Sequence, residues 1–143
     1  MQRTPRTASK LPGKIHPAIP PETERARRAV LDAAFKVHTA LGPGLLESVY
    51  ETACAYEIRK QGLAVATQVT LPIRYDDQEL ESGLRIDLLI EQCVIVELKA
   101  VEVMNPVFEA QLMTYLRLSG VRLGYLINFN VPHLKDGIKR MVY

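Results

Sequence analysis

Asp87, Glu97 and Lys99 are charged residues inside apolar, strand-like segments of this sequence. Asp87 belongs to Leu84–Ile90, while Glu97 and Lys99 belong to Cys93–Ala100, ten and twelve positions after Asp87. Burying charge in such segments costs free energy, so charged residues there indicate chemistry more than stability. Carboxylates are good ligands for a hard divalent cation such as Mg²⁺ or Mn²⁺, and a neighbouring ammonium can stabilise charge that develops on a phosphate. These residue types therefore predict metal-dependent hydrolysis of phosphodiester bonds.

The three side chains can act together only if the two segments pair in one particular register. Glu97 and Lys99 share a face because side chains alternate along a strand with period two. The segments are so close in the chain that we expect an antiparallel hairpin rather than a parallel crossover. A three-residue loop over residues 91–93, or a bulge, would place Asp87 beside Glu97. A two-residue loop would place Asp87 opposite Val96 and send the carboxylates to opposite faces.

Four further candidates lie on two predicted helices. Glu47 and Tyr50 are three positions apart, and Gln111 and Tyr115 are four apart, so each pair shares a helical face. We expect the helices to direct these groups at the sheet, where Gln111 would orient water or substrate and the tyrosines would brace the acids. Taken alone, each residue has a simpler explanation: Glu47 suits a helix N-terminus, Gln111 a surface, and the tyrosines a core. Only the joint arrangement favours a site.

The hydrophobic pattern predicts the elements that must position these residues. Helical spacing covers residues 22–41 and 45–60, and Gly42-Pro43-Gly44 separates the two helices. Alternation of apolar and polar residues from residue 63 predicts a strand that ends at Tyr75-Asp76-Asp77. One face of this strand would be formed by Val65, Thr67, Val69, Leu71 and Ile73. The other predicted elements are strands at 84–90, 93–100 and 123–129, a helix from Asn105-Pro106 to about Leu118, and a short extension at 137–143. This order is typical of an α/β sandwich with a mixed sheet.

The composition of the 143 residues fits one domain, which we expect over residues 21–143. Residues 1–20 hold four prolines and no acid, and their basic residues are Arg3, Arg6, Lys10 and Lys14. This composition predicts a flexible basic leader. The whole chain carries a net charge of +2, but the part after the leader has 14 basic and 16 acidic residues. Such an acidic domain is poorly suited to clamp a duplex alone, because phosphate binding depends on lysine and arginine.

Several classes of protein are disfavoured. No apolar run is long enough to span a membrane and no secretory signal is seen, so we expect a cytoplasmic protein. The absence of ligand-type spacing among His16, His38 and His133, of a glycine-rich phosphate loop and of a nucleophile elbow disfavours zinc fingers, nucleotide hydrolysis and serine hydrolysis. A paired-carboxylate glycosidase is also disfavoured, because Lys99 should lower the pKa of Glu97, whereas a general acid needs it raised.

The segment Gly44-Leu45-Leu46-Glu47-Ser48-Val49-Tyr50 resembles the signature of the bacterial GxxExxY proteins, a group within the PD-(D/E)xK nuclease superfamily. The resemblance spans about residues 27–143 and continues through residues 85–89, 94–100, 111–116 and 126–129. A bare D-x(n)-E-x-K pattern often occurs by chance, whereas this ordered set of motifs is specific.

The resemblance implies a restriction-endonuclease-like core, which is a three-layer α/β/α sandwich with a central mixed sheet. It also implies four ligands for Mg²⁺ or Mn²⁺: Asp87, Glu97, Glu47 and the backbone carbonyl of Leu98. Lys99 would assist catalysis, and Gln111 matches the glutamine of the second core helix. The implied substrate is nucleic acid, with DNA favoured, and the acidic domain predicts help from the leader, a homodimer or a larger assembly. Because a fold does not by itself establish activity, the alternative is a catalytically silent nucleic-acid-binding or assembly module.

Overall fold

The computed structural model describes residues 18–143 and begins with two helices, α2 (Pro21–Leu41) and α3 (Glu47–Lys60). The elements that follow are β1 (Val65–Tyr75), β2 (Gln78–Ile90), β3 (Val94–Lys99), α4 (Val107–Ser119), β4 (Leu123–Asn128), the short 3-10 helix η1 (Leu134–Gly137) and β5 (Ile138–Val142). Residues 1–17 of the predicted leader therefore lie outside the described residues. Within residues 18–143, no helix is both long enough and apolar enough to cross a membrane.

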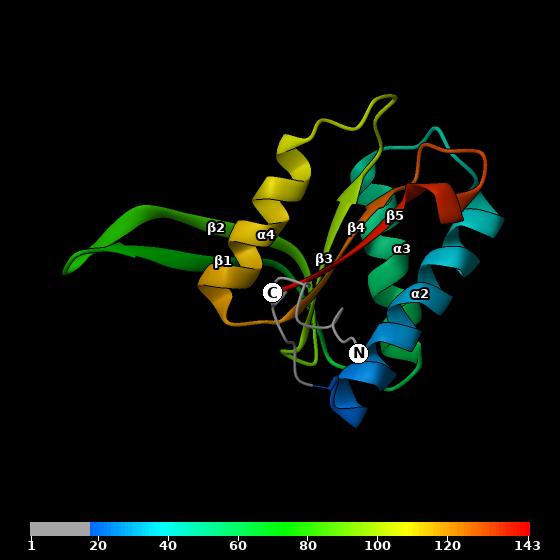
Figure 1. Cartoon of the computed structure of the whole chain (residues 1–143). Helices are drawn as coiled ribbons and strands as arrows, with labels where there is room; N and C mark the ends of the chain where they lie inside the picture. The colour runs from blue at the N-terminus through cyan, green and yellow to red at the C-terminus, as the bar shows by residue number, and fades with distance from the viewer. Residues whose placement is uncertain (1–17) are drawn as a thin grey trace, which may run out of the picture.

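The strands form one sheet in the order β1-β2-β3-β4-β5, and helices cover both of its faces (Figure 1). Neighbouring strands are antiparallel except β3 and β4, which are parallel and are connected through α4. α2 and α3 pack on one face of the sheet, and α4 packs on the other. The predicted three-layer α/β/α sandwich with a central mixed sheet is confirmed.

α4 begins and ends where local chemistry predicts. The Asn105 side-chain oxygen accepts a hydrogen bond of 2.9 Å from the backbone N–H of Val107, a donor that has no partner inside the helix. Gly120 ends the helix in a left-handed conformation with φ of 79°, which glycine adopts without steric cost. Between these ends, Leu112, Tyr115 and Leu116 are buried against the sheet.

The loop between β2 and β3 satisfies the register condition for the predicted site. It contains three residues, 91–93, and the last pair of the ladder joins Leu88 to Val96. Continuing this register by one step places Asp87 beside Glu97. The hairpin therefore brings the two carboxylates to the same place.

β1 does not keep one face along its length, so that prediction is wrong. Val65 packs on the side of α2 and α3, whereas Val69, Leu71 and Ile73 pack on the side of α4. The change of face occurs at Gln68, whose φ of 52° interrupts the regular pleat. β2 changes face at the same level, because residues 84 and 86 pack on the α4 side and residues 88 and 90 on the other.

β1 and β2 extend beyond the rest of the sheet as a two-stranded ribbon (Figure 1). β2 begins at Gln78, which pairs with Tyr75 across a tight turn, although the predicted strand begins only at Leu84. The early part of β2 escaped prediction because Gln78 and Glu79 are exposed and give no hydrophobic signal. The base of this ribbon forms one wall of the site described below.

The close approach of α4 to the sheet depends on Gly124. A Cβ atom there would lie 3.0 Å from a methyl carbon of Leu112 and 3.1 Å from one of Leu116. We expect Gly124→Val to lower the free energy of unfolding by about 1–3 kcal/mol, because the added atoms must displace a buried helix. Thermal denaturation followed by circular dichroism measures this effect. Ala110→Val, which adds bulk to the exposed side of α4, is the control, and equal losses in both variants would contradict the expectation.

Candidate active site

Six of the seven predicted side chains line one pocket of about 650 Å³ between α3, the base of the ribbon and α4. They are Glu47, Asp87, Glu97, Lys99, Gln111 and Tyr115. Four residues that were not predicted also line it: Ser48, Glu51, Gln68 and Arg85. The pocket therefore collects groups from two helices and three strands, which only a folded chain can bring together.

Asp87 and Glu97 hold one another in place through the backbone. Glu97 Oε2 accepts a hydrogen bond of 2.8 Å from the N–H of Asp87, and Asp87 Oδ2 accepts one of 2.9 Å from the N–H of Leu98. The side chains thus replace the ladder hydrogen bonds at the point where β2 and β3 cease to pair. This exchange fixes both carboxylates in the pocket.

The electrostatic environment of Glu97 differs from the one expected from the sequence. Glu97 is only 4% exposed, and burial together with the charge of Asp87 raises its pKa to about 8. Lys99 lowers this pKa, as expected, but its effect is smaller than those of burial and Asp87. The expectation of a lowered pKa is therefore wrong, because it counted the neighbouring charge and omitted desolvation.

Two other carboxyl groups in the pocket are perturbed in the same direction. Burial raises the pKa of Glu47, and the charge of Asp87 raises it further. Burial also raises the pKa of Glu51, although its hydrogen bond with Gln68 acts in the opposite sense. The pocket thus gathers acidic groups whose charge Lys99 and Arg85 offset only in part.

The donor set of the pocket fits a divalent cation. Four carboxylates line it against two cationic side chains, Arg85 and Lys99. No three histidine, cysteine, aspartate or glutamate side chains of residues 18–143 form a compact metal-binding group. A pair of acids is nevertheless enough for Mg²⁺, which usually keeps several waters and binds one or two carboxylates. Asp87 and Glu97 form such a pair, while direct ligation by Glu47 and by the Leu98 carbonyl stays a prediction.

The raised pKa of Glu97 predicts a pH-dependent stability in the absence of metal. Between the ordinary pKa of 4.5 and the folded value of about 8, the folded protein holds a proton that the unfolded chain has lost. The contribution of Glu97 to the free energy of unfolding should thus fall as pH rises through this range, by on the order of 1 kcal/mol per pH unit. Glu97→Gln should remove this component and raise the melting temperature of the metal-free protein at pH 8.

Melting curves of both proteins between pH 5 and pH 9, recorded with EDTA, provide the measurement. Glu24 and Glu57, whose pKa values are lowered by hydrogen bonds with Arg27 and Lys36 respectively, titrate in both proteins and cancel in the difference. A wild-type protein with the same pH profile as Glu97→Gln would contradict the expectation. Adding Mg²⁺ at pH 8 should stabilise only the wild type, because a bound cation offsets the negative charge.

Lys99 is positioned by the segment around it. Its Nζ lies 4.2 Å from the centroid of the Phe108 ring, at the distance of a cation–π contact. No ion pair within 4 Å involves it in the described part of the chain. Beyond it, the Asn128 side chain bonds to the backbone N–H and carbonyl of Val101. Lys99 therefore faces the pocket with its charge available to a ligand.

Tyr50 does not line the pocket, and its role differs from the one expected. Its hydroxyl donates a hydrogen bond of 2.6 Å to the Gly42 carbonyl and accepts one of 3.1 Å from the N–H of Leu45. Its ring stacks on Phe129 at 4.5 Å. Tyr50 thus braces the loop that precedes Glu47 and does not contact the acids. Its hydroxyl donates to one backbone group of that loop and accepts from another.

Two of the four unpredicted residues carried a usable signal. Glu51 lies one helical turn after Glu47, so helical spacing places both on one face of the helix. Arg85 lies two positions before Asp87, so the alternation of a strand places both on one face of the strand. Gln68 carried none, because it enters the pocket only through the interruption of the pleat at its own position.

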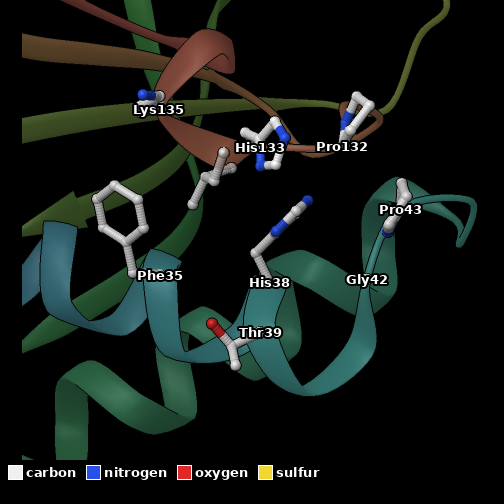
Figure 2. Close-up of a pocket in the computed structure, with 9 residues that line it drawn as sticks. Phe35, His38, Thr39, Gly42, Pro43, Pro132, His133 and Lys135 are labelled. Carbon is white, nitrogen blue, oxygen red and sulfur yellow. The ribbon is translucent and has the colours of Figure 1, made fainter.

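A second hollow, of about 480 Å³, lies beside the end of α2 (Figure 2). His38 points from α2 toward the segment that carries Pro132 and His133, and its Nε2 lies 2.8 Å from the Val131 carbonyl oxygen. Among the described residues that line this hollow, none is acidic. His38 therefore ties α2 to this segment, which is a structural role, while His16 lies outside the described residues.

Comparisons with known proteins agree with this geometry. A family model described as the PD-(D/E)XK nuclease superfamily matches residues 24–141. No curated protein matches the chain. The crystal structure of SSO0001 superposes with a TM-score of 0.50 at 16% identity, over 85% of this chain and 61% of that one. This chain thus spans less than two thirds of SSO0001, and at this identity the likeness supports the fold alone.

Proposed function

This chain belongs to the PD-(D/E)XK nuclease superfamily, and we propose that it is a nuclease that hydrolyses phosphodiester bonds with Mg²⁺ or Mn²⁺. One observation carries the proposal: backbone hydrogen bonds fix Asp87 and Glu97 side by side, the Glu97 carboxylate accepting from the N–H of Asp87 and the Asp87 carboxylate from the N–H of Leu98, in a pocket that also contains Lys99. A stability role does not explain this pair, since placing the half-buried Asp87 carboxylate beside the buried Glu97 carboxylate costs free energy unless a cation joins them.

Each side chain in the pocket has a role that its position supports. Asp87 and Glu97 would hold the divalent ion, which when bound supplies Lewis-acid chemistry by neutralising phosphate charge and making water more acidic. The Lys99 ammonium would stabilise charge that develops on the phosphate during attack. Gln111, on α4, would orient water or substrate by hydrogen bonding, and Glu47 would extend the acidic set from α3.

Within the superfamily, we propose that the chain is a member of the GxxExxY group and that DNA is its substrate. The residues that support the group are Gly44, Glu47 and Tyr50, and Tyr50 has a structural reason to be a tyrosine because it braces the loop before Glu47. The acidic balance after residue 20 supports a contribution from the basic leader or from a second copy to substrate binding.

A catalytically silent module is the second candidate. The observation that favours it is the charge of the pocket, where only Arg85 and Lys99 can attract a phosphate against four acids. This reading predicts nucleic-acid binding without cleavage and without binding of a divalent ion. Calorimetric titration with Mg²⁺ and Mn²⁺ separates the two candidates, because the nuclease must bind one of them at millimolar concentration or below.

The decisive experiment offers the full-length protein plasmid DNA, single-stranded DNA and RNA with Mg²⁺, Mn²⁺ or EDTA. We expect cleavage of DNA with either metal and none with EDTA. Cleavage that persists in EDTA would contradict metal dependence, and preferential cleavage of RNA would contradict the proposed substrate. Binding of a metal without cleavage of any of these substrates would contradict the proposed function.

A further inference from the structure

We propose that Arg85 binds a phosphate of the nucleic-acid substrate in this pocket and that Gln68 positions its guanidinium group. The inference rests on the proposed nuclease function and adds a group that holds the substrate backbone beside the acids. Arg85 touches the substrate in this proposal, whereas Gln68 acts only through Arg85 and Asp87.

Gln68 has a backbone conformation that glutamine rarely adopts. Its φ is 52°, although the ladder is regular on both sides, with Thr67 paired to Leu88 and Val69 paired to Ile86. Positive φ is unfavourable for a residue with a Cβ atom, and such strain is retained mainly where a side chain must be held in a special place. Here the interruption directs the Gln68 side chain into the pocket.

The Gln68 amide connects three charged side chains. Its Nε2 donates hydrogen bonds to Glu51 Oε1 at 2.5 Å and to Asp87 Oδ1 at 3.2 Å, and its Oε1 accepts one of 2.5 Å from Arg85 Nε. If the amide were reversed, its oxygen would lie against carboxylate oxygens and its NH₂ against a guanidinium, and neither contact could form a hydrogen bond. The chemistry of the neighbours therefore sets the orientation of the amide. Gln68 therefore links Arg85 to Asp87, the acid that is proposed to hold the metal.

Arg85 is the cation of the pocket that is not yet assigned a role. It is exposed, and Gln68 engages Nε while its two terminal NH₂ groups have no side-chain partner among the described residues. An arginine held at Nε keeps a planar pair of donors that suits the two free oxygens of a phosphodiester. Because Gln68 already holds the Arg85 side chain, less conformational entropy is lost when a phosphate binds.

A purely structural role for Arg85 makes a different prediction. Arg85 lowers the pKa of Glu51 electrostatically, so it could serve only to balance the acids. Its removal would then alter stability or metal affinity but leave the salt dependence of DNA binding unchanged. A phosphate contact, in contrast, lowers the slope of log affinity against log salt by about one when it is lost.

The test measures binding of fluorescently labelled single-stranded and duplex DNA, with Ca²⁺ in place of Mg²⁺, over a range of salt concentrations. We expect Arg85→Ala to weaken binding about tenfold and to reduce the salt slope by about one. Arg85→Lys should restore the slope but only part of the affinity, because the planar donor pair is lost. Arg25→Ala, which removes an exposed arginine of α2, is the control and should match the wild type.

The positioning role of Gln68 is tested by Gln68→Gly, since glycine accepts the positive φ and keeps the backbone. We expect a smaller loss of affinity than in Arg85→Ala, and a double variant that binds no more weakly than Arg85→Ala alone, because the two residues act through one contact. Additive losses would overturn the positioning role. DNA with a neutral methylphosphonate at the contacted linkage should bind the wild type more weakly and leave Arg85→Ala unaffected.

Cleavage with Mg²⁺, measured in parallel, separates this inference from the proposed function. A cleaving wild type whose Arg85→Ala variant keeps its affinity and salt slope overturns the inference and leaves the nuclease in place. An inactive wild type that binds DNA through Arg85 overturns the nuclease and supports the phosphate contact. A wild type that neither binds nor cleaves DNA overturns both.

Discussion

Asp87→Asn should leave the protein folded and slow its metal-dependent cleavage by about a hundredfold to a thousandfold or more. The substitution removes the negative charge of one of the two acids proposed to hold the metal. It keeps the fold, because an amide oxygen can still accept the hydrogen bond from the N–H of Leu98 that now ends on Asp87. The initial rate of plasmid cleavage and the calorimetric affinity for Mn²⁺ should therefore fall together.

The matched control for Asp87→Asn is Asp76→Asn at the tip of the ribbon. Asp76 is exposed and has φ of 54°, which asparagine tolerates well, so the same change of charge is made far from the pocket. The control should keep the rate and metal affinity of the wild type. Undiminished cleavage by Asp87→Asn would remove Asp87 from the site and with it the proposed metal position.

Lys99→Met should separate metal binding from cleavage. Methionine keeps an unbranched side chain beside Phe108 and loses only the ammonium group, which has no ion-pair partner within 4 Å in residues 18–143. We expect cleavage to fall by about a hundredfold or more, since charge developing on the phosphate loses its stabilising partner. Affinity for Mn²⁺ should not fall, because removing a cation leaves the carboxylates more attractive to another.

This split is measured by single-turnover cleavage beside calorimetric titration. Lys99→Arg restores the charge with a different shape and should recover part of the rate. If Lys99→Met weakened metal binding as strongly as Asp87→Asn, Lys99 would have to be assigned to the structure of the site. If it cleaved at the wild-type rate, Lys99 would have no part in the reaction.

The sequence by itself determined the elements of the fold and most members of the site. Element limits follow from local chemistry, as in α4, where the Asn105 oxygen bonds to the first turn and Gly120 ends the last. Charge within apolar strands marked Asp87, Glu97 and Lys99, because burying charge has a cost whatever the partners are. These signals act over a few residues, so they can be read along the chain.

The tertiary structure alone decided how the site is assembled. The three-residue loop chose the register that brings Asp87 to Glu97, and the positive φ of Gln68 changed the face of β1 and brought Gln68 into the pocket. Packing between the layers then raised the pKa of Glu97 against the influence of Lys99. The position of Gln68 and the pKa of Glu97 depend on contacts between elements, and the loop register on pairing between strands, none of which the pattern along one element contains.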